Sequence, residues 1–266
     1  MSLAVETSAE TYVLRDDRYG VAWLTLNRPH AYNALSTELI ATMQESLDAI
    51  AVDSSVKVVV LRGAGKGFCA GHDLKQMQAN RSEAYYKSVF ASCSKMMMSL
   101  MELPQPVIGC VHGIATAAGL QLLASCDLAV AEANTRFGTP GVNIGLFCST
   151  PMVAVSRKVQ RKKMMEMLLT GEMLDTSAAL DQGLINKAVP ADQLEGAVSE
   201  LAAKIVSKSP AVVKIGKQAF YKQLEMPLAE AYAFTSEVMT HNMMIDDATE
   251  GMTAFTEKRA PIWKGK

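Results

Sequence analysis

Two glycine-rich turns in the first half of the sequence carry the residue types that can hold a developing negative charge. The first is RGAGKGFCAGHDLK, residues 62–75, where a buried strand ends and Asp73 can cap a following helix. Backbone N–H groups just before a helix have no partner within it, and such groups stabilise a carbonyl oxygen that gains negative charge. A glycine-rich surface loop ahead of a capped helix explains the same residues, and spacing alone does not separate the two interpretations.

The second turn lies in VHGIATAAGLQLLASCD, residues 111–127, where small side chains from Ala115 to Gly119 stand between a strand and a helix. Free N–H groups near the helix start, beside side chains small enough for a ligand to approach, again indicate an anion or oxyanion site. Close packing of the helix on a sheet is the alternative. Since both turns belong to successive strand–helix units, they can face one crevice at the carboxyl ends of the strands. Two donors would then form one oxyanion hole.

The reactive side chains near these turns give weaker indications. Cys148 has no visible partner that would lower the pKa of its thiol, which favours packing over nucleophilic attack. The side chain of His72 is either a general base or a solvated loop histidine beside Asp73. His112 precedes a glycine on a predicted buried turn, so we expect it to be structural.

The elements that must position these turns alternate between strands and helices. Apolar runs predict strands at 12–15, 21–27, 57–63, 104–113 and 127–133, and helices at about 36–52, 81–103 and 119–126. Units of this kind imply a mostly parallel sheet with right-handed crossovers. From Pro151 the pattern is almost wholly helical, with helices expected over 193–208, 211–224 and 227–256. We therefore expect an α/β protein of one domain, residues 1–266, with a core over about 12–195 and a helical C-terminal region over about 196–266.

Composition excludes several classes of partner. The 266 residues carry Lys+Arg 26 against Asp+Glu 27, a net charge of −1, so no overall field attracts nucleic acid or a membrane surface. The sequence has no apolar run of roughly 18 residues and no secretory signal pattern. The five cysteines form no CxxC pair and no metal-binding spacing. Reduced thiols in the cytoplasm, without a bound metal, are the expectation.

Motifs along nearly the whole chain, about 12–263, resemble those of the enoyl-CoA hydratase/isomerase, or crotonase, superfamily. The matching stretches are LNRPHAYNALS, FCAGHDLK, HGIATAAGLQL, FGTPGVNIGL and LTGEMLDTSAALDQGLINKAVP. This resemblance implies the ClpP/crotonase-like fold, built from repeated ββα units, and a C-terminal helical region that forms a homotrimer or a dimer of trimers. The GLFCSTP and ATAAG stretches are most similar to the subgroup called enoyl-CoA hydratase domain-containing protein 3.

The resemblance also implies a site for an acyl-coenzyme A thioester, with no tightly bound cofactor. The two oxyanion donors of the family fall on the backbone N–H groups of His72 and Ala118. The family's coenzyme A contacts fall on His30, Ala31, Ala70, Gly71, Asp73 and Leu74, with Phe255 and Lys258 supplied by a neighbouring subunit. Nearby lysines such as Lys66 and Lys75 can meet its phosphates despite the neutral overall charge.

The sequence departs from the family at the residues that move protons. The two hydratase glutamates fall on Gln121 and Gly141, and the aspartate of isomerases and dehalogenases falls on Ser149. An amide can orient a water but cannot take its proton, and a glycine offers only space. Each positioned acid or base is worth roughly 10²–10⁴ in rate, so ordinary hydration of an enoyl-CoA is not expected. In naphthoyl-CoA synthases a bicarbonate replaces the second glutamate, which makes a bound anion near Gly141 the corresponding hypothesis.

Two functions therefore stay open at the level of the sequence. One is an enzyme of hydratase/isomerase type, a lyase or isomerase of fatty acid metabolism, whose proton-transfer groups are non-standard. The other is an acyl-CoA-binding protein without catalysis. A purely structural subunit is disfavoured because the two turns are retained. The expected compartment is the cytoplasm, or the mitochondrial matrix if a presequence has been removed.

Overall fold

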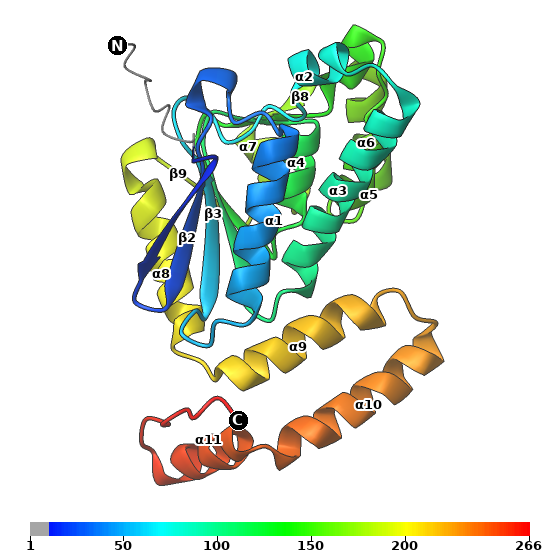
Figure 1. The fold of residues 1–266 in the computed structure, drawn as a ribbon. Helices are drawn as coiled ribbons and strands as arrows, with labels where there is room; N and C mark the ends of the chain where they lie inside the picture. Colours follow the sequence, from blue (N-terminus) through cyan, green and yellow to red (C-terminus); the bar gives the residue numbers. More distant parts are fainter. Residues whose placement is uncertain (1–10) are drawn as a thin grey trace, which may run out of the picture.

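A six-stranded sheet forms the centre of the computed structural model, which describes residues 11–266 (Figure 1). The strand order is β1-β2-β3-β4-β6-β9, with only β1 and β2 antiparallel. The strands are β1 (Val13–Arg18), β2 (Val21–Leu26), β3 (Val58–Gly63), β4 (Val107–Val111), β6 (Leu128–Glu132) and β9 (Lys187–Val189). This architecture confirms the expected α/β fold with a mostly parallel sheet.

The first strand is longer than the sequence pattern indicates. It continues to Arg18, and the hairpin turns at Tyr19 and Gly20, both with positive φ. Every residue of β1 after Val13 is exposed, since it is an edge strand, and Arg15 and Arg18 form ion pairs with neighbouring aspartates. Charged side chains are common on edge strands, where they discourage pairing with other chains. Here they interrupt the apolar pattern from which the strand was predicted, so the prediction ended at residue 15.

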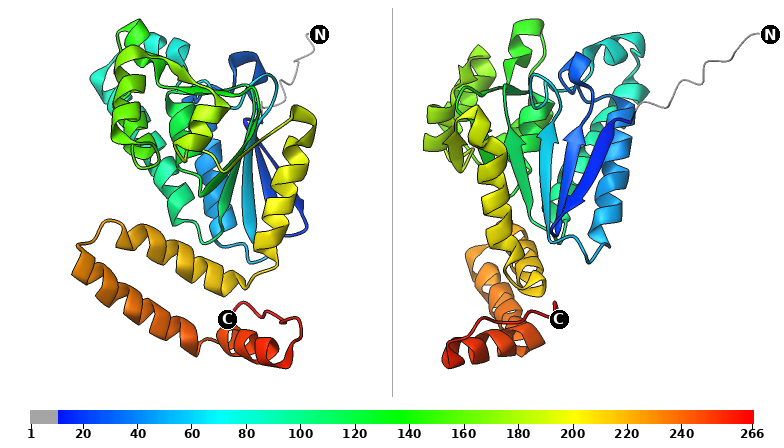
Figure 2. Two further views of the ribbon diagram at one scale, coloured as in Figure 1. Left: turned by 180° about the vertical axis from the view of Figure 1, so that it is seen from behind. Right: turned by 90° about the vertical axis from the view of Figure 1, so that its left-hand side faces the viewer.

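Helices cover both faces of the sheet (Figure 2). Helix α1 (Thr37–Ala51) begins at Ser36, whose Oγ accepts the N–H of Leu39, and packs against α3 (Glu83–Glu102) within the larger core. On the opposite face, α8 (Leu194–Val206) buries Val198 and Ala202 in a second core with inner residues of the sheet. The sheet is thus enclosed on both sides, as its continuous apolar strands require.

A second, three-stranded sheet supports the second glycine-rich turn. It contains β5 (Ile114–Thr116), β7 (Arg136–Gly138) and β8 (Met173–Leu174), and α4 (Ala118–Ala124) starts directly after β5. The remaining short elements are η1 (Pro29–Ala31), α2 (Leu74–Ala79), η2 (Pro140–Ile144), α5 (Ser149–Val155), α6 (Arg161–Thr170), α7 (Thr176–Asp181) and η3 (Ala191–Gln193).

The last three helices extend away from the sheet and its covering helices (Figures 1 and 2). They are α9 (Pro210–Gln223), α10 (Leu228–Met244) and α11 (Asp246–Glu257). The single helix expected over 227–256 is therefore wrong, because Ile245 is extended with ψ 155. The buried carboxylate of Asp247 holds this corner: it accepts the Ser209 hydroxyl and the backbone N–H groups of Lys264 and Gly265.

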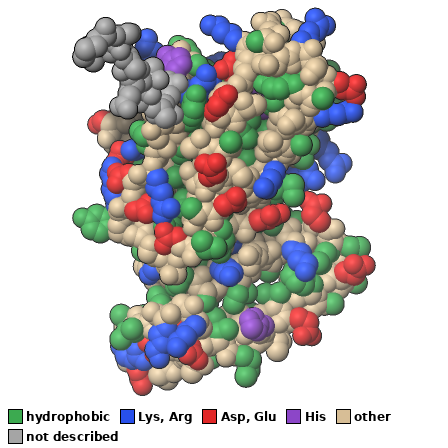
Figure 3. Space-filling view, in the orientation of Figure 1, with side chains coloured by type: hydrophobic (Ala, Val, Ile, Leu, Met, Phe, Trp, Pro, Cys, Tyr) green, Lys and Arg blue, Asp and Glu red, His purple; other side chains and the backbone are tan. Residues whose placement is uncertain are grey.

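Helix α10 leaves most of its apolar side chains uncovered. Ala231 is its one buried residue, whereas Leu228, Tyr232 and Met244 are 75%, 69% and 80% exposed. Figure 3 shows further apolar side chains on the surface of this C-terminal part. Apolar surface of this extent on a separate helical arm is typical of a protein interface. None of the helices in residues 11–266 combines the length and hydropathy needed to cross a bilayer.

Candidate active site

The two glycine-rich turns leave the sheet at the same edge. The first follows β3 and the second follows β4, and these strands are parallel neighbours with Val59 opposite Val107. Parallel strands end at one edge of a sheet, so the crevice expected from the sequence has the required topology. Cys69 and Ala115 form an isolated bridge that joins the two turns directly.

Asn33 holds the first turn from inside the protein. Its side chain is fully buried, and Nδ2 donates to the carbonyl oxygens of Ala64, Gly67 and Phe68 at 2.9, 2.9 and 3.1 Å. Its Oδ1 accepts the N–H of Arg28. Loop carbonyls buried away from water need such partners. The sequence reasoning did not single out Asn33. The available signal was a polar asparagine directly before the apolar residues Ala34 and Leu35 in LNRPHAYNALS.

Asp73 is an anchor of the same turn. Its carboxylate accepts the N–H groups of Lys75 and Gln76 at the start of α2 and bonds the Arg28 guanidinium at 2.9 Å, with both side chains mostly buried. Burial opposes ionisation, but the Gln76 N–H and the Arg28 guanidinium together lower the pKa of Asp73. The carboxylate is therefore ionised and fully engaged within the protein.

The backbone pairing of this turn directs one amide outward. Leu35 donates its N–H to the Gly71 carbonyl at 2.7 Å, and Asp73 donates its N–H to the Leu35 carbonyl at 3.1 Å. In such a pairing the N–H of the intervening residue points to the other side. The N–H of His72 accordingly faces away from Leu35, and it has no backbone acceptor among residues 11–266.

The second turn presents an equivalent amide. Ala117 donates its N–H to the Gly138 carbonyl at 2.9 Å, while the N–H of Ala118, the first residue of α4, meets no backbone acceptor in the described chain. Ala117 has φ 49 and ψ −121, a conformation that costs an alanine roughly 1–3 kcal/mol. Strain of this kind persists where surrounding structure enforces it. Here the bond to Gly138 supplies one of those constraints.

Gly71 brings the two turns into contact. A Cβ built on it would lie 3.0 Å from Ala117 Cβ, 3.2 Å from the Thr116 carbonyl oxygen and 3.3 Å from the Ala118 nitrogen. The residue next to His72 therefore touches the turn that carries the Ala118 amide. With φ +100, Gly71 also has a backbone conformation that other residues rarely adopt. Helices α2 and α4 are short, so the unbonded amides, more than helix dipoles, carry the positive potential.

The two positions at which the sequence resemblance places the family's glutamates differ in their surroundings. Gln121 lies in α4, is 5% exposed, and its Oε1 is buried without a hydrogen-bond partner among the described residues. Thr139, which directly follows β7 and precedes η2, has a buried hydroxyl without a hydrogen-bond partner in the described structure, and the sequence reasoning did not single it out. Neither side chain takes a proton from water at neutral pH. Both can orient one.

Gly141 does not leave space, which corrects the expectation from the sequence. A Cβ there would lie 2.9 Å from Cys148 Sγ and 2.9 Å from the Leu146 carbonyl oxygen. The Cβ side of Gly141 therefore has no room for a bound anion. Burial raises the pKa of the Cys148 thiol, although the Gly141 N–H offsets part of this effect. Ser149 begins α5 on the surface, and its hydroxyl lies 3.4 Å from the Phe147 carbonyl.

His72 is half-buried and its two ring nitrogens are shielded from solvent, so the alternative of a solvated loop histidine is wrong. Both ring nitrogens are inaccessible and have no hydrogen-bond partner in the described structure. The ring meets Phe90 edge-on, with centroids 5.5 Å apart. Burial lowers the pKa of His72, and the nearby Leu35 carbonyl offsets only part of the fall, so the ring is neutral at pH 7. His112, by contrast, has Nε2 2.9 Å from the Gly65 carbonyl oxygen.

The other predicted coenzyme A contacts fall into two groups. His30 and Ala31 lie on η1, Ala70 donates its N–H to the Tyr32 carbonyl, and Leu74 starts α2 with 45% exposure. These residues surround the first turn, and the side chains of Lys66 and Lys75 are exposed near them. Phe255, 86% exposed, and Lys258 lie at the end of α11, on the far side of the molecule from α2 (Figure 1). They do not join the site of their own chain.

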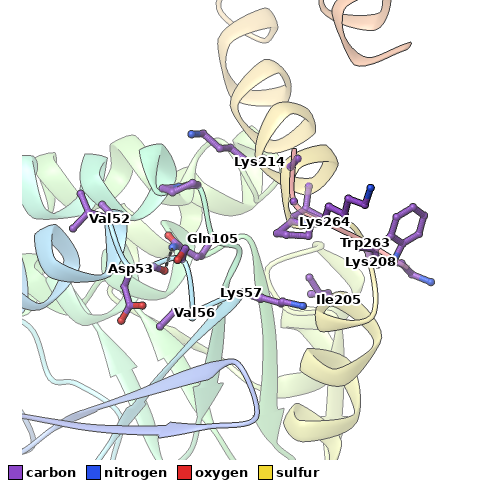
Figure 4. A pocket seen from close by; sticks show the side chains of 17 residues that line it. Val52, Asp53, Val56, Lys57, Gln105, Ile205, Lys208, Lys214, Trp263 and Lys264 are labelled. Carbon is purple, nitrogen blue, oxygen red and sulfur yellow. Dashed lines mark hydrogen bonds between the residues drawn. The ribbon is translucent and has the colours of Figure 1, made fainter. Parts of the chain in front are cut away.

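A hollow of about 470 Å³ lies elsewhere in the described structure (Figure 4). It separates the end of α1 from the start of α9 and the C-terminal tail, at the amino ends of the strands. Lys57, Lys208, Lys214 and Lys264 line it beside Trp263. None of the residues predicted for the active site contributes to it. No group of His, Cys, Asp and Glu suited to a metal ion occurs within residues 11–266.

Comparison with known proteins assigns the family. The sequence profile described as enoyl-CoA hydratase/isomerase matches residues 16–266. "Enoyl-CoA hydratase domain-containing protein 3, mitochondrial" of Xenopus laevis is 44% identical over 245 residues, 92% of this chain and 83% of the relative. The crystal structure of an enoyl-CoA hydratase from Mycobacterium smegmatis superimposes with TM-score 0.93 at 50% identity, covering 95% of this chain and 98% of that one. Human enoyl coenzyme A hydratase domain-containing protein 3 gives TM-score 0.92 at 43% identity over 95% and 100%. This chain therefore belongs to the enoyl-CoA hydratase/isomerase family and is related to enoyl-CoA hydratase domain-containing protein 3.

Proposed function

We propose that this protein binds an acyl-CoA and holds the thioester oxygen between the backbone N–H groups of His72 and Ala118. The observation that carries the proposal is that both amides lack a backbone acceptor while their turns touch through Gly71. Two preorganised donors about 3 Å from one oxygen stabilise the negative charge of a thioester enolate. Relatives named enoyl-CoA hydratase support the ligand class.

The reaction we propose is a non-standard or weak member of the hydratase/isomerase type. Polarisation of the thioester acidifies the α-carbon and activates a conjugated double bond, whichever group then moves the proton. Gln121 and Thr139 can orient a water without activating it. Strong hydration of an enoyl-CoA is therefore not part of the proposal.

A non-catalytic acyl-CoA-binding protein is the second candidate, and one observation favours it. The Cβ position of Gly141 is filled by Cys148 Sγ and the Leu146 carbonyl oxygen, so the chain has closed around the place of the second glutamate. A binder keeps the two amides and needs no proton acceptor.

We also propose that the chain assembles as a homotrimer, alone or in pairs, through its C-terminal helices. The exposed apolar side chains of α10 support this, as does the distance of Phe255 and Lys258 from the site of their own chain. In the assembly, these two residues would complete the coenzyme A site of a neighbour. The five free, buried cysteines suit a reducing compartment, either cytoplasm or mitochondrial matrix, and the vertebrate relatives are named mitochondrial.

The decisive test compares butyryl-CoA with its S-butyl thioether, which lacks only the carbonyl oxygen. At 100 times its dissociation constant a ligand adds about 2.7 kcal/mol to the unfolding free energy. We expect clear thermal stabilisation by butyryl-CoA and weaker stabilisation by the thioether. Equal stabilisation by both would refute the oxyanion hole, and none by either would refute acyl-CoA binding. Crotonyl-CoA turnover, measured in parallel, separates the weak enzyme from the binder.

A further inference from the structure

Unmatched positive charge surrounds the hollow of Figure 4, between the core and the C-terminal arm, which comprises α9, α10, α11 and the tail that follows them. Four lysines from different elements line it. Lys57 directly precedes β3, Lys208 precedes α9, Lys214 lies within α9, and Lys264 belongs to the tail. Within residues 11–266 none of the four forms an ion pair or a side-chain hydrogen bond. Their ammonium groups are therefore free to meet an anion.

The carboxylate that lines the same hollow does not balance these charges. Asp53 Oδ2 lies 2.7 Å from Arg15 Nη2, and Oδ1 accepts the N–H and the hydroxyl of Ser55 at 3.0 and 2.6 Å. The Ser55 hydroxyl and the Arg15 guanidinium lower the pKa of Asp53 to about 2, so the carboxylate is ionised and committed to these partners. The lysines stay a group of like charges that repel one another.

Two further polar groups at the hollow lack partners in the described structure. Helix α9, 14 residues long, begins there, and the N–H of Ala211 in its first turn has no acceptor, which adds the positive end of a helix dipole. Gln105 is 7% exposed, and its Nε2 donates to the Ile50 carbonyl at 2.9 Å while its Oε1 is left unbonded. A buried polar atom without a partner calls for an explanation such as a bound water or ligand.

Trp263 adds a flat apolar wall whose position is fixed. Its Nε1 donates to the Ser207 carbonyl at 2.9 Å, and a Cβ built on Gly251 would lie 3.2 Å from the ring. The residue is only half-buried, so part of the indole stays open for contact. The volume of about 470 Å³ falls within the range of roughly 300–1,000 Å³ of small-molecule sites. Ammonium groups bind phosphates and aromatic faces stack on planar rings, so a nucleotide fits both features.

We propose that this hollow is a second ligand site, for a nucleoside diphosphate whose phosphates meet the lysines and whose base stacks on Trp263. It lies at the amino ends of the strands, whereas the two glycine-rich turns follow the carboxyl ends of β3 and β4. The lysines come from the core, from α9 and from the tail. A bound anion relieves their mutual repulsion and thereby holds the C-terminal arm against the core.

ADP is the probe, and pyrophosphate is the analogue that lacks the base and the ribose. In calorimetric titrations at low salt, we expect ADP to bind the wild-type protein. Lys57→Met and Lys264→Met should each weaken ADP binding by roughly tenfold, the worth of one hydrogen bond between charged groups. Trp263→Leu should weaken ADP binding and leave pyrophosphate binding unchanged. Lys204→Met is the matched control, since Lys204 is exposed on α8 and does not line the hollow.

Thermal unfolding provides a readout that damage to the fold does not imitate. Removing one of several like charges relieves repulsion, so Lys57→Met and Lys264→Met should melt no lower than the wild type without ligand, yet lose most of the stabilisation by ADP. Melting well below the wild type without ligand would contradict the repulsion among the lysines and so overturn the inference.

Coenzyme A itself contains a nucleoside diphosphate, so a competition titration separates the two sources of this group. Saturating butyryl-CoA should leave ADP binding in place, and the lysine variants should keep the wild-type affinity for butyryl-CoA. Absence of ADP binding, unchanged ADP affinity in the lysine variants, or displacement of ADP by butyryl-CoA overturns the inference. Equal binding of ADP and pyrophosphate overturns the part given to Trp263. Each of these outcomes leaves the proposed thioester site intact.

Discussion

Replacing Gly71 by alanine tests whether contact between the two turns sets the spacing of the donor amides. The new methyl group would lie 3.0 Å from Ala117 Cβ and 3.3 Å from the Ala118 nitrogen, so the Ala117–Ala118 turn must move by a few tenths of an ångström. The positive φ of Gly71 adds backbone strain of roughly 1–3 kcal/mol. The backbone strain lowers the stability of the protein, whereas displacement of the Ala118 amide weakens its hydrogen bond to the thioester oxygen.

The size of the binding effect follows from how sharply such sites depend on position. A displacement of 1 Å can cost about 10²-fold, and loss of one oxyanion donor costs roughly 10²–10³ in rate. The ground-state thioester gains less than the transition state: one hydrogen bond contributes about 0.5–1.5 kcal/mol, so weakening these bonds by a shift of a few tenths of an ångström should lower the affinity for butyryl-CoA by up to about tenfold. The S-butyl thioether has no carbonyl oxygen, so its affinity should change little. Calorimetric titration of both ligands measures the two effects.

Gly183→Ala separates displacement from strain. Gly183 has a similar positive φ of 75, yet the nearest atom to its Cβ position is 3.8 Å away and it lies outside both turns. This variant should lose stability and keep the affinity for both ligands. If Gly71→Ala bound butyryl-CoA as tightly as Gly183→Ala does, or lost both ligands equally, the spacing argument would be refuted.

Asn33→Ala leaves two buried carbonyl oxygens and one part-buried carbonyl oxygen without their donor, so the unfolding free energy should fall by about 3–5 kcal/mol; an unchanged denaturation midpoint would contradict the role given to this side chain. Gly141→Glu should lower the melting temperature sharply and restore no crotonyl-CoA hydration, because its Cβ meets the Leu146 carbonyl oxygen at 2.9 Å; a folded variant with rapid hydration would show that the loop adapts. The Arg259 guanidinium and the Ile262 N–H lower the pKa of Glu250 to about 2, so its stabilising contribution is present above its unfolded value near 4.5 and is lost as the pH falls toward 2. The melting temperature should accordingly decline between about pH 4.5 and 2, and less steeply in Glu250→Gln.

The sequence by itself determined the fold class and the places of the two turns. Both follow from signals between near neighbours: apolar runs for strands, 3.6-residue periodicity for helices, and glycines or small residues where the backbone must turn. Motif order along the chain then indicated the family, which the comparisons confirm. The sequence alone also showed that positions 121 and 141 hold glutamine and glycine and not glutamate, because the residue type at a position does not depend on the fold.

Only the tertiary structure decided what surrounds each of these residues. Three features of the site join segments distant in sequence. They are the hydrogen bonds from Asn33 to the first turn, the shielding of the His72 ring nitrogens from solvent, and the contact of Cys148 with the Cβ position of Gly141. The break at Ile245 likewise depends on Asp247 meeting the C-terminal tail. Local propensity encodes backbone conformation over a few residues, whereas burial and hydrogen-bond satisfaction are set by packing between elements, and the chemistry of this site depends on the latter.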